Sequence, residues 1–129
     1  MSAIRGSLEG ESLTSAISAS MVDLYARHYG HHRTTGTTYI NENVVVCVLE
    51  DILSTAESSL VASGEAKEVI DGRVSFQEGM EDEFTAEIER LTGRRVTAFL
   101  SANQTTPGVA CELFFLEAPF AVAATPSEV

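Results

Sequence analysis

The chain has 129 residues, of which 44% are hydrophobic, enough for one ordinary domain with its own core. Its formal net charge is -11, and residues 41–93 alone hold thirteen acidic side chains against three basic ones. Such a surface repels nucleic acid and anionic lipid, so we expect neither as a partner. The longest apolar run, 44–49, is far shorter than the roughly 20 residues of a membrane helix, which argues against direct membrane insertion.

The two cysteines, Cys47 and Cys111, both lie in apolar segments. Residues 1–10 do not have the apolar core of a secretory signal, so we expect a cytoplasmic protein without a disulfide framework. Both thiols are interpreted as reduced, buried packing residues. A redox pair remains the alternative if their two strands are adjacent and in register.

The first half of the chain predicts one helix followed by a hairpin. Helical spacing over residues 8–29 places six residues on one face, and Gly30 is a suitable stop: Leu13, Ile17, Ser20, Met21, Leu24 and His28. The polar, glycine-containing stretch 31–38 is predicted to be a loop. Two β-rich runs, 37–41 and 44–49, then flank a tight turn at Glu42 and Asn43.

The second half predicts two helices and another strand pair. Ser54 and Glu57 have the spacing of a capping box, which favours a short helix over 55–63. A longer helix is predicted over 66–92, ended by Gly93, with a solvated acidic face. Strands are predicted at 96–101 and 110–116, joined by a polar loop over 102–108. We expect residues 1–7 and 118–129 to be flexible ends of a single domain spanning 8–117.

This order, α-ββ-αα-ββ, indicates the α+β class, with a four-stranded, mostly antiparallel sheet packed against helices. Alternation along the last two strands puts apolar side chains on both faces of that sheet. Cys111, Leu113 and Phe115 point one way and Phe114 the other, while Val96, Ala98 and Leu100 are predicted to oppose Phe99. Either the first helix covers the second face or another subunit does, and on this basis we predict a homodimer.

One basic and polar stretch is the candidate binding site. Hydroxyls, a glycine backbone and arginines can cradle an anion, and we expect the turn after Gly93 to bring two more arginines close to it. The candidate ligand-binding residues are Arg27, His28, His31, His32, Arg33, Thr34, Thr35, Tyr39, Arg94 and Arg95. A solvated helix end is the simpler interpretation of the His and Arg residues, since cations favour that pole of the helix dipole.

No catalytic, metal or cofactor pattern accompanies this stretch. The three histidines lack a nearby acid or cysteine that would complete a tetrahedral metal set. The sequence has no Walker pattern and no Gly-x-Ser-x-Gly, and neither cysteine is close to a histidine in sequence. We therefore expect no catalytic residues, no metal and no cofactor.

Several segments together resemble the MpsC-like domain family of the sodium-translocating, membrane-potential-generating system, over about residues 8–117. The resemblance lies in the order and spacing of Val22, Leu24-Tyr25, Tyr29-Gly30, Thr38-Tyr39, the runs 44–49 and 50–54, Ala56-Glu57, Phe76-Gln77, Met80, Phe84, 91–94, Val96 and 98–101. The chain departs from the family after Gly30, where the family usually has a proline and basic residues.

The resemblance implies an accessory or regulatory domain linked to membrane cation or inorganic-carbon uptake, acting by protein–protein interaction, with a membrane protein as a further partner. It supplies no catalytic residues. A small-anion or nucleotide-binding module is one alternative. An enzyme whose site assembles at a subunit interface is another, which a deep inter-subunit pocket with a buried glutamate would favour.

Overall fold

The computed structural model describes residues 10–30 and 33–118 as helices on one side of an antiparallel sheet. The predicted ends and the two histidines at 31 and 32 lie wholly or mostly outside these residues. The elements are α2 (Glu11–Tyr29), β1 (Thr35–Asn41), β2 (Val44–Glu50), α3 (Thr55–Ala62), α4 (Ala66–Thr92), β3 (Val96–Thr105) and β4 (Gly108–Leu116). The predicted α+β class and element order are confirmed.

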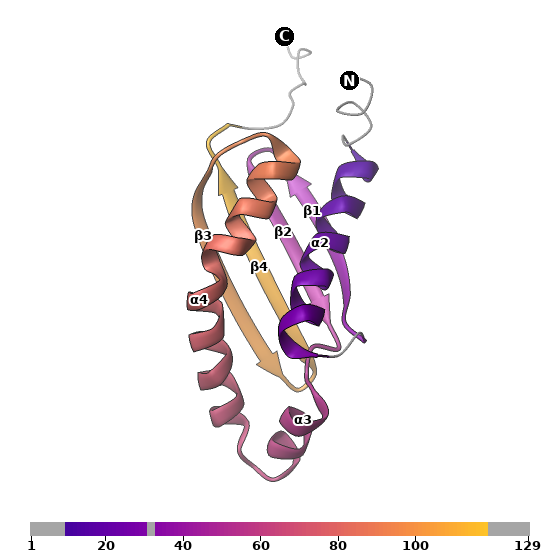
Figure 1. Cartoon of the computed structure of the whole chain (residues 1–129), viewed down its shortest axis with the longest axis vertical. Helices are drawn as coiled ribbons and strands as arrows, with labels where there is room; N and C mark the ends of the chain where they lie inside the picture. Colours follow the sequence, from indigo (N-terminus) through magenta and orange to yellow (C-terminus); the bar gives the residue numbers. More distant parts are fainter. Residues whose placement is uncertain (1–9, 31–32, 119–129) are drawn as a thin grey trace.

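The four strands run in the order β1-β2-β4-β3, and each neighbouring pair is antiparallel. The predicted hairpin is present, with Glu42 in its turn at a φ of 56°. Figure 1 shows α2 and α4 crossing the same side of the sheet, with α3 beyond its lower end. The core lies between these two helices and the inner face of the sheet, where Ile17, Phe84, Ile88 and Phe114 are fully buried.

Local signals account for the helix boundaries. The α2 and α4 helices end at Gly30 and Gly93, which take the left-handed conformation with φ of 77° and 70°. That conformation costs an L side chain energy that glycine does not incur, so both helices stop where glycine allows the chain to turn.

The strands β3 and β4 are longer than the sequence predicted. The predicted loop over 102–108 is mostly strand, because Ala102, Asn103 and Gln104 pair with β4 and only a tight turn around Thr106-Pro107 connects the two. A register shift between Val96 and Ala98 is the second difference. This bulge turns Val96 towards the core, so the prediction that it shares a face with Ala98 and Leu100 was wrong.

The predicted capping box is also confirmed. The Ser54 hydroxyl accepts a hydrogen bond from the Glu57 backbone N–H at 3.1 Å, and the Glu57 carboxylate accepts one from the Ser54 N–H at 2.9 Å. This reciprocal pair satisfies two backbone donors that the first turn of α3 leaves free. It also fixes the position of the Glu57 side chain.

We expect Ser54→Ala to lower the free energy of unfolding by about 1 kcal/mol, the usual loss for an N-cap. Urea unfolding followed by circular dichroism measures it. Ser58→Ala is the matched control, because Ser58 is exposed within the same helix. Equal stabilities of the two variants would show that the cap contributes nothing.

Candidate functional site

The predicted site residues at the end of α2 bind to side chains of the protein itself. Arg27 forms an ion pair with Asp23 at 3.0 Å on the same exposed helix face. The His28 Nε2 atom lies 3.6 Å from the Glu83 carboxylate on α4. The first contact lies within α2 and the second joins α2 to α4, and surface contacts of this kind contribute little to stability.

Arg33, Thr34 and Thr35 join the beginning of β1 to the end of β2. The Arg33 guanidinium donates to the Leu53 carbonyl at 2.9 Å, and the buried Thr34 hydroxyl donates to the Asp51 carbonyl at 3.0 Å. Thr35 lies opposite Glu50 in the register. The Arg33 and Thr34 side chains expected to cradle an anion are therefore engaged in holding the chain's own backbone.

Arg94 and Arg95 lie at the opposite end of the sheet from Arg33. They precede Val96, which pairs with Leu116, beside the hairpin turn of β1 and β2. The seven-residue strand β2 separates this end from Thr35, a length of about 20 Å. Among the described residues, the expected meeting of these two arginines with Arg33, Thr34 and Thr35 therefore does not occur.

A hollow at this far end is lined by Glu89, Gly93, Arg94 and Arg95. Carboxylates already accompany its cations, because Arg95 lies 3.5 Å from Glu117 and Glu89 accepts a hydrogen bond from the Val96 N–H. The hollow therefore has no excess of positive charge for an anion. Ligand binding by the predicted residues stays a prediction that the geometry does not strengthen.

The structure instead reveals a buried polar cluster between α3, α4 and the sheet that the sequence analysis did not single out. At its centre is Arg73 of α4, whose side chain is 1% exposed. Its guanidinium donates to both carboxylate oxygens of Glu57, at 2.7 and 2.9 Å, and to the Ile52 carbonyl at 2.6 Å. The same guanidinium lies 4.1 Å from the centre of the Tyr29 ring, within cation–π range.

These contacts control the ionisation of their partners. Burial of Glu57 opposes its charged form, but the hydrogen bonds from Arg73 and from the Ser54 backbone are stronger together and lower its pKa. Burial raises the pKa of Tyr29 to about 12, even though the positive charge of Arg73 acts in the opposite direction. At neutral pH the cluster thus contains an arginine–glutamate ion pair beside a neutral phenol.

A second buried acid, Glu112 of β4, lies on the inner face of the sheet and is fully buried. The Tyr25 hydroxyl donates to its Oε2 atom at 3.2 Å and the Gln77 amide at 3.4 Å. Ser101, opposite in the register, favours the charged form but makes no hydrogen bond of good geometry to Oε1. Burial is the largest influence and raises the pKa of Glu112.

A signal for this cluster was present in the helical spacing. The buried positions of α4 include Arg73 and Gln77 between Val69 and Met80, so two polar residues occupy the core stripe. Glu112 likewise takes an inward position between Ala110 and Phe114. Its inward position inside one subunit, under helices, does not match the inter-subunit pocket that an interface enzyme would need.

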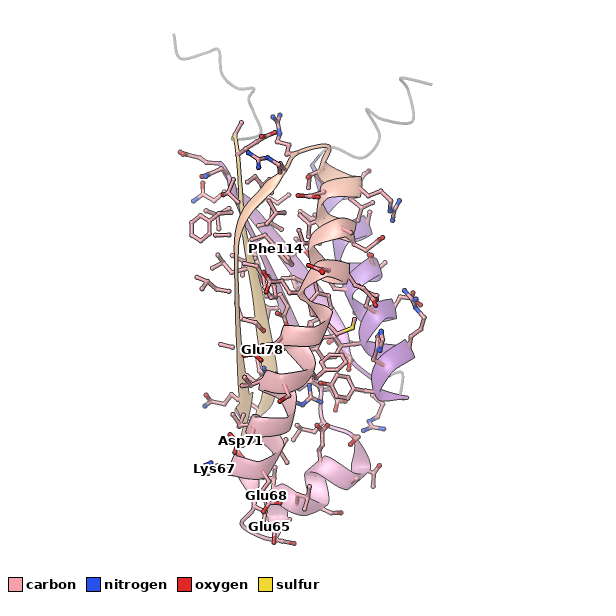
Figure 2. The ribbon with its side chains drawn as sticks, turned by 60° about the vertical axis from the view of Figure 1, so that its left-hand side comes forward. Glu65, Lys67, Glu68, Asp71, Glu78 and Phe114 are labelled. Carbon is pink, nitrogen blue, oxygen red and sulfur yellow. The ribbon has the colours of Figure 1, made fainter. Side chains whose placement is uncertain are left out.

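No metal site is found in the part of the chain that the structure describes, where no three His, Cys, Asp or Glu side chains are arranged to hold an ion. The acidic residues of α4 lie along its exposed side, and Figure 2 shows Glu65, Glu68 and Asp71 towards its lower end. Lys67 pairs with Asp71 at 2.8 Å on this surface.

The outer face of the sheet is the other unusual feature. Neither α2 nor α4 contacts it, and Figure 2 shows side chains projecting from this side with no described helix or strand over them. We call it the open face. Most of it consists of three cross-strand rows: Thr37-Val48-Cys111-Ala102, Tyr39-Val46-Leu113-Leu100 and Asn41-Val44-Phe115-Ala98. A fourth row, Thr35-Glu50-Val109-Gln104, borders these three and carries one carboxylate.

These three rows contain no charged residue, although the chain has 27 of them. Tyr39 and Leu100, at the two ends of the middle row, are 59% and 60% exposed. The predicted two-faced sheet is therefore confirmed, and α2 does not cover its second face. A contiguous apolar patch of this kind often serves as an interaction site.

The two cysteines divide between these faces. Cys47 is buried on the inner face, as predicted, but Cys111 is only partly buried because it belongs to the open face. Their strands are adjacent, yet the thiols point to opposite sides of the sheet. Both are free, and the redox-pair alternative has no geometry to support it.

Fold and surface together define an α+β domain whose sheet is covered by helices on one face and, among the described residues, by no element on the other. The family model described as "Na+-translocating membrane potential-generating system (MpsC)" matches residues 9–118. The chain belongs to the MpsC family. No curated protein and no solved structure matches it. Within residues 10–30 and 33–118, no helix is long and apolar enough to cross a membrane.

Proposed function

We propose that the chain is an accessory domain that works by protein–protein contact within the Na+-translocating system for which its family is named. The open face supports this proposal most strongly. An uncharged surface with Tyr39 and Leu100 more than half exposed gains free energy when another protein replaces the water on it. The two free cysteines agree with a reducing, cytoplasmic location.

The proposed role is regulatory or structural rather than catalytic. Arg73 and Glu112 are buried in the core, and the Glu57 carboxylate, which is only partly exposed, is occupied by Arg73. They hold α3, α4 and the sheet in place and so maintain the shape of the open face. A membrane protein of the same system is the partner that the family description suggests.

In the test, the gene for this chain is replaced, in the organism that carries it, by genes that encode variants of the chain. Leu100→Glu places a charge at one end of the middle row of the open face without removing a core residue, because Leu100 is 60% exposed. Val74→Glu is the matched control, since Val74 is 46% exposed on α4, away from the sheet. A voltage-sensitive dye reports the membrane potential of cells with sodium present.

We expect Leu100→Glu to reproduce the deletion and Val74→Glu to reproduce the wild type. Immunoblotting checks that both variants accumulate equally. A Leu100→Glu strain that behaves like the wild type, beside a deletion strain with a clear defect, would contradict a function exerted through the open face.

A further inference from the structure

We infer that the open face is covered by a second copy of this chain, packed sheet to sheet. The inference rests on the proposed function, in which this face is a contact surface, and specifies its occupant. Figure 2 shows the bare side of the sheet opposite the helical side. Two sheets packed in this way lie about 10 Å apart, with the side chains of their facing surfaces interleaved.

Charge is the first reason to choose a second copy. The three main rows of the open face have no charged residue, and Glu50 lies in the row that borders them, whereas the chain as a whole has a net charge of -11. A basic partner would be attracted to the acidic helical side and would find only Glu50, at the border of the open face, to pair with. A second copy meets an apolar surface with an identical one, and neither brings a charge that requires a partner.

The arrangement of the rows is the second reason. Val46 and Leu113, at the centre of the middle row, lie opposite each other on the antiparallel strands β2 and β4. Apolar side chains extend from this centre in both directions, to Tyr39 at one edge and Leu100 at the other. In a two-fold contact each surface meets its own copy, so a patch that is apolar from edge to edge is self-complementary.

The extent of the face sets the expected strength. Four strands spaced about 4.8 Å apart and three rows spaced about 6.8 Å apart give a footprint of about 400 Å². A standard stable interface buries about 800 Å² on each partner, so this contact belongs with weaker, reversible ones. We expect a weak, reversible dimer.

Salt dependence separates this dimer from a contact between opposite charges. Two chains of charge -11 repel each other outside the apolar contact, and added salt screens that repulsion. We therefore expect association to tighten as the NaCl concentration rises from about 0.05 to about 0.5 M. Association that weakens with salt would point to paired charges at the interface and contradict the inference.

Sedimentation equilibrium of the purified full chain, from about 1 to 500 μM, is the decisive experiment. The wild type and Val74→Glu should dimerise alike, and Leu100→Glu should weaken the dimer at least about 100-fold, because each copy then buries an unpaired carboxylate. Circular dichroism establishes that all three are folded. A wild type that stays monomeric, or a Leu100→Glu variant that dimerises unchanged, would overturn the inference.

These results are separable from those on function. A monomeric wild type combined with a Leu100→Glu strain that resembles the deletion would reject the second copy and retain a contact role for the open face. A dimer sensitive to Leu100→Glu, combined with a normal strain, would retain the second copy and reject the proposed function. A dimer also leaves the helical side of each copy available to a membrane-protein partner.

Discussion

Replacing Arg73 by leucine lowers the free energy of unfolding by about 3–5 kcal/mol, the usual consequence of removing one partner of a buried ion pair. The guanidinium is almost completely buried and donates to both oxygens of Glu57 and to the Ile52 carbonyl. Leucine supplies none of these donors, so the Glu57 carboxylate is left largely buried without its cation. This is the largest single effect that we expect from a polar residue.

Urea unfolding of the purified protein at pH 7 measures this change. Arg90→Leu is the matched control, because Arg90 forms a comparable 2.7 Å ion pair with Glu87 but its side chain is 63% exposed. We expect that control to cost about 0–1 kcal/mol. If Arg73→Leu lowered the free energy of unfolding no more than Arg90→Leu does, the buried pair would be shown not to support the fold.

The Arg73–Glu57 pair also makes the free energy of unfolding depend on pH. The pKa of Glu57 is lower in the folded chain than its ordinary value, so the folded state binds fewer protons in that range. Its contribution to stability is therefore present above the ordinary pKa of a glutamate and is lost as the pH falls through the lowered, folded-state pKa. Arg73→Leu should reduce this acid-side loss, since the lowered pKa depends on the guanidinium.

Glu112→Gln is expected to have the opposite effect and stabilise the protein at neutral and alkaline pH. Burial raises the pKa of Glu112, so between its ordinary and raised pKa the folded state binds more protons than the unfolded state. Stability consequently falls as the pH rises through that window. Glutamine keeps the size of the side chain and an acceptor for the Tyr25 hydroxyl while removing the charge.

At pH 8, Glu112→Gln should raise the free energy of unfolding by about 1–3 kcal/mol, which is the order of the cost of an imperfectly satisfied buried group. This gain should shrink as the pH is lowered towards the ordinary pKa of a glutamate. Glu50→Gln provides the control, because Glu50 is exposed on the neighbouring strand. A Glu112→Gln variant that is less stable than the wild type at pH 8 would mean that the carboxylate is needed in its charged form.

The sequence predicted the elements well where local chemistry decides them. The helix α4 has the predicted bounds because apolar spacing and Gly93 both mark them. The strands β3 and β4 extend further than predicted because the polar residues after Ser101 are held by cross-strand pairing, which residue type does not reveal. The bulge beside Val96 is equally invisible to simple alternation.

The sequence predicted the apolar outer face of the sheet but not the buried polar cluster. The two-faced sheet was predictable from alternation, since successive side chains of a strand point to opposite faces of the sheet. The buried cluster was not predicted, because Arg73 and Glu112 become partners of Glu57 and Tyr25 only when distant segments pack together. The expected grouping of Arg33 with Arg94 failed for the same reason, as the length of β2 separates them.

Alkylation of Cys111 in living cells tests most directly whether the open face is a contact surface. Cys111 lies on that face and is partly accessible, whereas Cys47 is buried under the helices and serves as the internal reference. N-ethylmaleimide enters cells, and mass spectrometry of the two peptides gives the extent of labelling. We expect Cys111 to react much more slowly in cells than in dilute purified protein, and Leu100→Glu to abolish the difference. Equal rates in cells and in dilute solution would mean that the open face is bare where the protein works, and would contradict the account.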